Sequence, residues 1–82
     1  MKLYEDPKIA RYNSNLKKMR ILRTLTQEEL SKISGVNIKS LTMYEQIPEK
    51  LSSASVSTVY KLACALNCDI EDILNKDTIN DI

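Results

Sequence analysis

The chain has 82 residues, enough for one domain with a small core, and its 43% apolar and 28% charged residues are typical of a globular protein. It contains no histidine and a single glycine, which excludes a histidine general base, a Cys/His zinc site and a glycine-rich phosphate loop. No apolar run is long enough to span a membrane and no signal peptide follows Met1, so we expect a cytoplasmic protein without cofactor, metal or catalytic set.

The positive charge is concentrated in the first half of the chain. Residues 1–39 contain nine basic and four acidic residues, whereas residues 40–82 contain three basic and seven acidic residues. A nucleic-acid-binding protein needs a positive face near the phosphates, but its net charge need not be strongly positive. The net charge of +1 is therefore compatible with DNA binding. This distribution supports a nucleic acid as the partner of the basic half.

The first predicted helix runs from about Pro7 to Arg23. Asp6 is a suitable N-cap, and Pro7 takes the first helical position, where its missing N–H is harmless. Apolar residues then recur at intervals of three and four, which predicts one apolar stripe along a continuous helix. The stripe consists of Ile9, Tyr12, Leu16 and Met19.

The second predicted helix spans about Gln27 to Ser34. Thr26 can cap it while Glu29 reaches back to the backbone N–H of Thr26, and together they form a capping box. Leu30 and Ile33 are expected on one side of this helix. Gly35 follows where the chain must leave the helix in a left-handed conformation, which costs glycine little.

The third predicted helix spans about Ile38 to Gln46, with Asn37 as its N-cap and Pro48 as its stop. Leu41 and Tyr44 are expected to face inward. Four side chains are left pointing away from the core: Ile38, Lys39, Thr42 and Met43. Two short helices joined by a tight glycine turn indicate a helix-turn-helix, a motif that usually binds DNA.

Residues 47–54 are expected to form a polar loop, followed by a fourth helix capped by Ser55 and closed by Asn67. The apolar face of this helix consists of Val56, Val59, Leu62, Ala63 and Leu66. Asp69 caps a short fifth helix that packs back onto the core through Ile70, Ile73 and Leu74. We expect one domain over residues 1–82, with its core at about 14–75 and a flexible tail at 76–82.

The cysteine and tyrosine side chains each have two candidate environments. Cys64 and Cys68 lack a second pair of ligands, so they could hold a metal only by sharing it between two chains, and we expect buried, reduced thiols instead. Tyr12 and Tyr60 lie on the apolar stripes and are expected in the core or in an interface.

Taken together, these residues resemble the phage repressor and Cro type of helix-turn-helix, the XRE family, from about Leu16 to Leu74. The resemblance rests on Arg20, the Leu-Thr-Gln-Glu-Glu-Leu of residues 25–30, Gly35-Val36, Tyr44-Glu45, and Leu62-Ala63 with Leu66. It implies an all-α, compact five-helix bundle of the lambda-repressor type, whose third helix enters the major groove of DNA. The chain is most similar to the small stand-alone regulators within this family.

The resemblance also implies individual roles. Arg20 and Glu45 would form a buried structural ion pair between the first and third helices. Gln27 would contact a phosphate or a base edge, and Asn37 a phosphate. The residues facing the bases would be Ile38, Lys39, Thr42 and Met43. Lys17 and Lys50 would meet the DNA backbone, although Gln46-Ile47 replace the family's common Asn-Gly and the loop that follows is longer than usual.

We therefore predict a sequence-specific transcriptional regulator, a repressor that binds a palindromic operator in double-stranded DNA as a homodimer. The alternative is a protein-interaction module of the same fold, such as an antitoxin or an anti-repressor. Ile38, Met43 and Ile47 favour this alternative, because apolar side chains can form a protein-binding patch. Without a recognisable catalytic set, the chain is not expected to be an enzyme.

Overall fold

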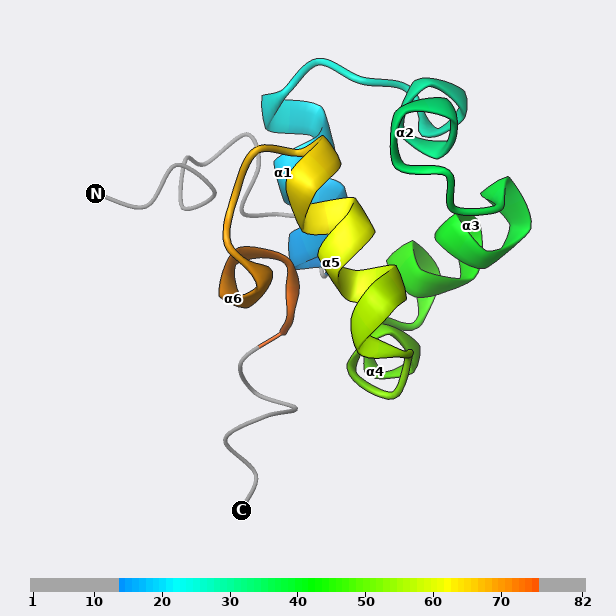
Figure 1. Ribbon diagram of the computed structural model, residues 1–82, viewed down its shortest axis with the longest axis vertical. Coiled ribbons are helices and arrows are strands. Elements are labelled where there is room, and N and C mark those ends of the chain that lie inside the picture. Colours follow the sequence, from blue (N-terminus) through cyan, green and yellow to red (C-terminus); the bar gives the residue numbers. More distant parts are fainter. Residues whose placement is uncertain (1–13, 76–82) are drawn as a thin grey trace.

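The structure is a computed structural model that describes residues 14–75. All regular secondary structure in this range is helical. The helices are α1 (Asn15–Leu22), α2 (Gln27–Ser34), α3 (Ile38–Gln46), α4 (Pro48–Ser52), α5 (Val56–Ala65) and α6 (Ile70–Ile73). In Figure 1, α5 crosses in front of α1, with α2 and α3 on one side and α6 on the other.

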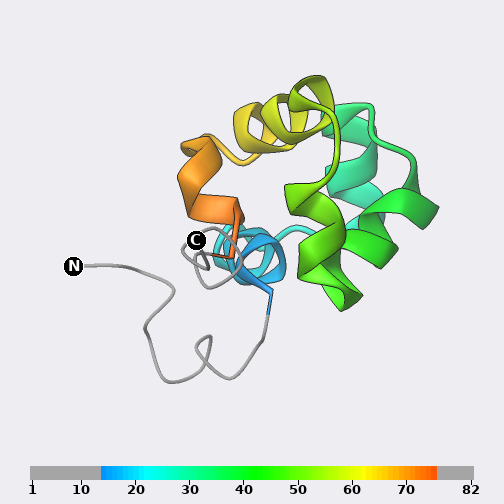
Figure 2. The same ribbon diagram turned by 90° about the horizontal axis from the view of Figure 1, so that it is seen from below.

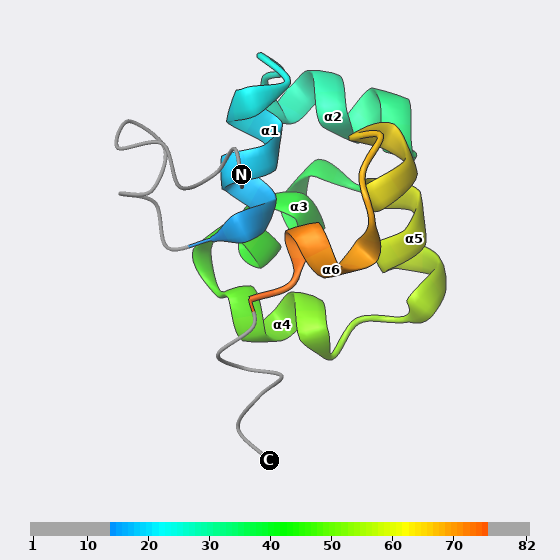
Figure 3. The same cartoon turned by 90° about the vertical axis from the view of Figure 1, so that its left-hand side faces the viewer.

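The core lies at the centre of these helices. Its most deeply buried side chains are less than 2% exposed: Leu16, Leu30, Leu41, Leu51, Leu62, Leu66 and Ile73. Each described helix contributes one of them, and Leu66 is the C-cap of α5. The view in Figure 3 shows α1, α2, α5 and α4 arranged around this centre. In Figure 2, α6 (orange) lies beside α1 (blue), against which it packs.

The bounds of α2 are those predicted from its capping residues. The Thr26 hydroxyl accepts a hydrogen bond from the Glu29 backbone N–H at 3.1 Å, and the Thr26 N–H donates to Glu29 Oε1 at 2.8 Å. At the other end, Gly35 has φ 78°, and its N–H donates to the Ser31 carbonyl at 2.9 Å. Both ends of α2 are thus fixed by local hydrogen bonds, as is typical of a capping box and a glycine C-cap.

The predicted start of the first helix at Pro7 is wrong for the helix that reaches Leu22. Ser14 is extended, with φ −95° and ψ 122°, and its hydroxyl accepts from the Lys17 N–H at 3.1 Å. This N-cap starts α1 at Asn15, whose side chain donates to the Leu74 carbonyl at 2.9 Å. The buried positions of Leu16 and Met19 agree with the predicted stripe. Pro7, Ile9 and Tyr12, like the predicted tail 76–82, lie outside the described residues.

The predicted loop at 47–54 contains a helix, so residues 14–75 form six helices and not five. Pro48 ends α3, as expected, and it also takes the first position of α4, where its fixed φ suits a helix. Leu51 anchors this short helix because its side chain, 1% exposed, lies in the core. The Pro48 and Leu51 pair is therefore the sequence signal that the loop prediction missed.

Three apolar side chains expected in packed faces are exposed. Val56 is 78% exposed because it is the first residue of α5 and lies beyond the core that Val59 and Leu62 reach. Ile33 is 59% exposed, since α2 turns Leu30 and Ser34 inward instead. Tyr60 is also 59% exposed, which excludes the core alternative and leaves the interface alternative open.

The two cysteines differ in environment, and the prediction that both are buried is wrong. Cys64 is exposed on α5, whereas Cys68 is half-buried. Burial raises the pKa of the Cys68 thiol to about 11, and the nearby Asp72 carboxylate acts in the same direction. Because the thiolate is the reactive form, Cys68 should be the less reactive of the two.

We expect alkylation to distinguish the two thiols, which we still predict to be reduced and metal-free. At pH 8, only about one Cys68 side chain in a thousand is a thiolate. Iodoacetamide should therefore label Cys64 first, and mass spectrometry of a time course should show a singly modified species at Cys64. In urea both residues should react. Equal rates in the folded protein, or stoichiometric zinc in the purified protein, would contradict the prediction.

Candidate nucleic-acid interface

Hydrogen bonds fix the turn between α2 and α3. The Ser31 hydroxyl donates to the Val36 carbonyl at 2.6 Å, and the Val36 N–H donates to Ser34 Oγ at 3.1 Å. Val36 itself is 7% exposed and belongs to the core. The Asn37 side chain then accepts from the Lys39 N–H at 2.7 Å and starts α3 at Ile38. The orientation of α3 relative to α2 is therefore set by the turn.

The outward side of α3 carries the four residues predicted to face DNA bases. Lys39 is exposed, Ile38 and Met43 are each 37% exposed, and Thr42 is half-buried. The opposite side of the helix is turned inward through Leu41 and Glu45. The structure thus brings these four side chains together on one accessible surface, which we call the reading face.

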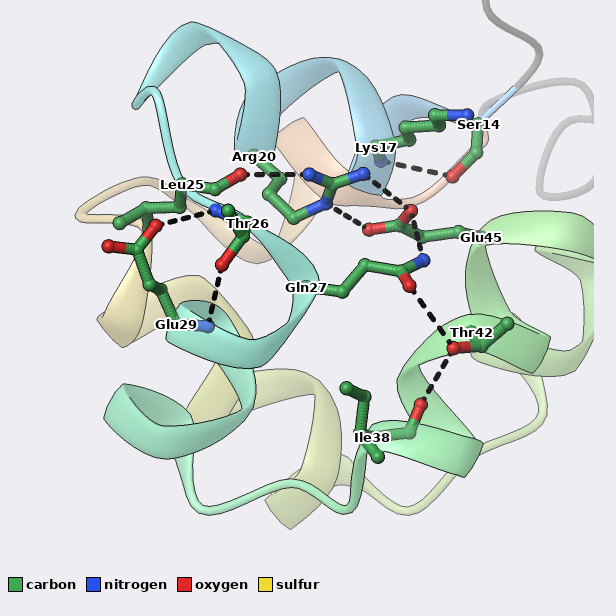
Figure 4. A network of polar contacts seen from close by, with 10 residues as sticks. All are labelled: Ser14, Lys17, Arg20, Leu25, Thr26, Gln27, Glu29, Ile38, Thr42 and Glu45. Carbon is green, nitrogen blue, oxygen red and sulfur yellow. Dashed lines mark hydrogen bonds and ion pairs between the residues drawn. The ribbon is translucent and has the colours of Figure 1, made fainter.

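The structure brings Arg20 and Glu45 together in a bidentate ion pair (Figure 4). Arg20 Nε lies 2.6 Å from Glu45 Oε2, and Nη2 lies 3.0 Å from Oε1. The two side chains are 11% and 2% exposed, respectively. Arg20 also donates from Nη1 to the Leu25 carbonyl at 2.8 Å. This cluster joins α1, α3 and the segment that precedes α2.

Two predicted DNA-binding residues extend this ion pair into a polar network (Figure 4). Gln27 Nε2 donates to Glu45 Oε1 at 3.0 Å. The Thr42 hydroxyl lies 3.4 Å from Gln27 Oε1 and 2.9 Å from the Ile38 carbonyl oxygen. Sequence reasoning missed these links because Gln27 lies far from both partners in the sequence, and no local pattern marks such a contact.

The remaining residues predicted to contact DNA lie on α1, at the N-cap of α3 and on α4. Lys17, on α1, lines an open groove of about 570 Å³ together with Arg20, Gln27 and Ile38. Asn37 is exposed, with its side-chain oxygen engaged in the α3 cap. Lys50 is exposed on α4 and not on a loop as expected. Contacts of these three residues with phosphates remain a prediction.

Comparison with known proteins identifies the family. The family model described as helix-turn-helix matches residues 16–73, and that span includes all six described helices except the first residue of α1. No curated protein and no solved structure gave a match. No helix within residues 14–75 has the length and apolar character needed to cross a membrane. The chain therefore belongs to the XRE-type helix-turn-helix family of DNA-binding transcription regulators.

Proposed function

We propose that this protein is a sequence-specific repressor that binds a palindromic operator as a homodimer. The observation that carries the proposal is the reading face of α3, held at a fixed angle by the α2 turn. A helix of this kind fits the major groove, where each base pair presents a distinct pattern of donors and acceptors. Residues 14–75 would form the DNA-binding domain of a cytoplasmic protein.

The distribution of charge supports this orientation on DNA. Within residues 14–46, six basic residues accompany three acidic ones, whereas residues 47–75 contain two basic and four acidic residues. The excess of positive charge is therefore on the helices that carry the reading face and the Lys17 groove. Positive charge at this surface attracts phosphates and leaves sequence discrimination to the base contacts.

The proposal predicts a two-fold symmetric operator. Selection from random DNA duplexes should enrich a palindrome whose half-sites are about 10 base pairs apart, one helical turn. Replacing Lys39 and Thr42 by Ala should lower the ratio of operator affinity to random-DNA affinity, because both belong to the reading face. If no palindrome is enriched and affinity at low salt stays in the high micromolar range, the repressor proposal is wrong.

One observation favours a second candidate, the protein-interaction module. Ile38 and Met43 are each 37% exposed and Ile47 is 44% exposed, so α3 and its C-cap carry three exposed apolar side chains. Such side chains can touch a thymine methyl group but cannot form bidentate hydrogen bonds with a base. An antitoxin would instead form a stable complex with the product of a neighbouring gene, and Met43→Ser with Ile47→Ser would abolish that complex.

A further inference from the structure

The buried carboxylate of Glu45 fixes the orientation of the Gln27 side chain. Glu45 is 2% exposed and lies 3.0 Å from the Gln27 amide nitrogen. The opposite orientation would place the Gln27 carbonyl oxygen against a carboxylate oxygen, two acceptors with no hydrogen between them. The amide nitrogen therefore points inward, and Oε1 points toward Thr42 (Figure 4).

The Thr42 hydroxyl has one hydrogen and two neighbouring acceptors. The Ile38 carbonyl oxygen lies at 2.9 Å and Gln27 Oε1 at 3.4 Å. The shorter and stronger hydrogen bond takes the hydrogen, as expected of a threonine one turn after the carbonyl. With the hydrogen donated to the Ile38 carbonyl, Gln27 Oε1 and Thr42 Oγ1, which lie 3.4 Å apart, both keep lone pairs that can accept from an outside donor. We call these two oxygen atoms the acceptor pair.

The acceptor pair lies between α2 and the reading face of α3. Gln27 is half-buried and lines the 570 Å³ groove that also contains Ile38, the first residue of α3. Thr42 is half-buried on the reading face, one turn further along α3. A donor that approaches this part of α3 can therefore meet both oxygen atoms together, in a hydrogen bond shared between two acceptors.

We propose that Gln27 and Thr42 act together as a specificity-determining acceptor pair that reads an exocyclic amino group in the major groove. This inference rests on the proposed DNA-binding function. Adenine N6 and cytosine N4 are donors in that groove, whereas guanine O6 and thymine O4 are acceptors. Each half-site should thus contain one position at which adenine or cytosine is accepted on one strand and guanine or thymine is rejected.

Of the two contacts that the family resemblance implies for Gln27, a phosphate or a base edge, the acceptor pair favours the base edge. A phosphate oxygen only accepts hydrogen bonds, so at the acceptor pair it would face two further acceptors. The Gln27 amide nitrogen carries two N–H groups; one is directed to Glu45 at 3.0 Å, and only the second could serve a phosphate. The two contacts make different predictions. A base contact makes the affinity depend on the base at that position, whereas a phosphate contact does not.

The test begins with the operator obtained by selection and replaces the base at the amino-selective position. Exchanging adenine there for purine, which lacks the N6 amino group, should weaken binding of the wild-type protein by about tenfold. Gln27→Ala and Thr42→Val should bind the two duplexes with similar affinity, while discrimination at every other position is retained. Glu71→Gln, a change at an exposed residue of α6 that does not line this groove, is the control and should retain the tenfold difference.

The possible outcomes separate this inference from the function on which it rests. If an operator is enriched but Gln27→Ala weakens binding to all duplexes by one common factor, the acceptor pair is refuted and the repressor proposal stands. An operator without an amino-selective position would likewise refute the acceptor pair and leave the repressor proposal standing. If no operator is enriched, both proposals fail. Circular dichroism at the assay temperature verifies that each variant is folded, and Thr42→Val provides an independent test should Gln27→Ala unfold.

Discussion

Arg20→Met is expected to lower the free energy of unfolding by about 3–5 kcal/mol, a large share of the total stability of a small domain. The substitution removes both guanidinium hydrogen bonds from the Glu45 carboxylate, which is 2% exposed. Gln27 would remain as a neutral partner, and it cannot balance the buried charge. The Leu25 carbonyl would also lose its hydrogen bond from Arg20.

Urea denaturation followed by circular dichroism measures this effect as a lower midpoint at an unchanged slope. Lys32→Met is the control, because Lys32 is an exposed cation of α2 and its replacement should change stability by less than about 0.5 kcal/mol. Replacing Glu45 by Met as well should restore part of the loss, since no unpaired buried charge would remain. A midpoint equal to that of the wild type would show that the pair contributes nothing.

The helices whose bounds were predicted best are those whose ends are fixed by residues close by in the sequence. The capping box of Thr26 and Glu29 and the left-handed Gly35 define α2 within ten residues of sequence, so both bounds were predicted correctly. The start of α1 was not, because the prediction rested on Asp6-Pro7 whereas the N-cap that starts α1 is Ser14. Ser14 is supported by contacts of Asn15 with Leu74 and with Asn75, which no local pattern reveals.

The same distinction applies to the candidate site. Helical periodicity was sufficient to place Ile38, Lys39, Thr42 and Met43 away from the core, because that depends only on the side chains that α3 buries. The direction of the Gln27 amide depends on Glu45, which lies on another helix and is itself oriented by Arg20 of a third. Tertiary contacts thus decide which hydrogen-bonding groups the reading face presents, and the sequence pattern alone did not predict this.

Glu45 consequently links stability with recognition. Its carboxylate accepts hydrogen bonds from Arg20 and from Gln27, so one buried side chain holds α1 to α3 and also orients the acceptor pair. A substitution at Glu45 should therefore alter both the denaturation midpoint and the base preference, whereas Lys39→Ala should alter only binding. Measuring both properties on the same variants distinguishes a residue that supports the reading face from one that belongs to it.

The affinity of the dimer for DNA is expected to fall by about 10³ to 10⁵ between 50 mM and 200 mM salt. About three to five phosphate contacts per protomer give about six to ten per dimer, which corresponds to a log–log salt slope of roughly −5 to −9. Lys17 on α1 and Lys50 on α4 are the cations that we assign to two of these contacts in each protomer. Fluorescence anisotropy with an operator duplex and a random duplex measures the slope.

Lys17→Ala and Lys50→Ala should each weaken binding to both duplexes about equally and reduce the steepness of the slope by about one for each phosphate that the variant no longer neutralises. Lys61→Ala is the matched control, because this exposed lysine of α5 lines a groove with Ile33 and Tyr60 and not the groove of Lys17. Its slope should equal that of the wild type. If Lys17→Ala weakens binding to the operator alone, Lys17 contacts a base, and its assignment to the DNA backbone is wrong.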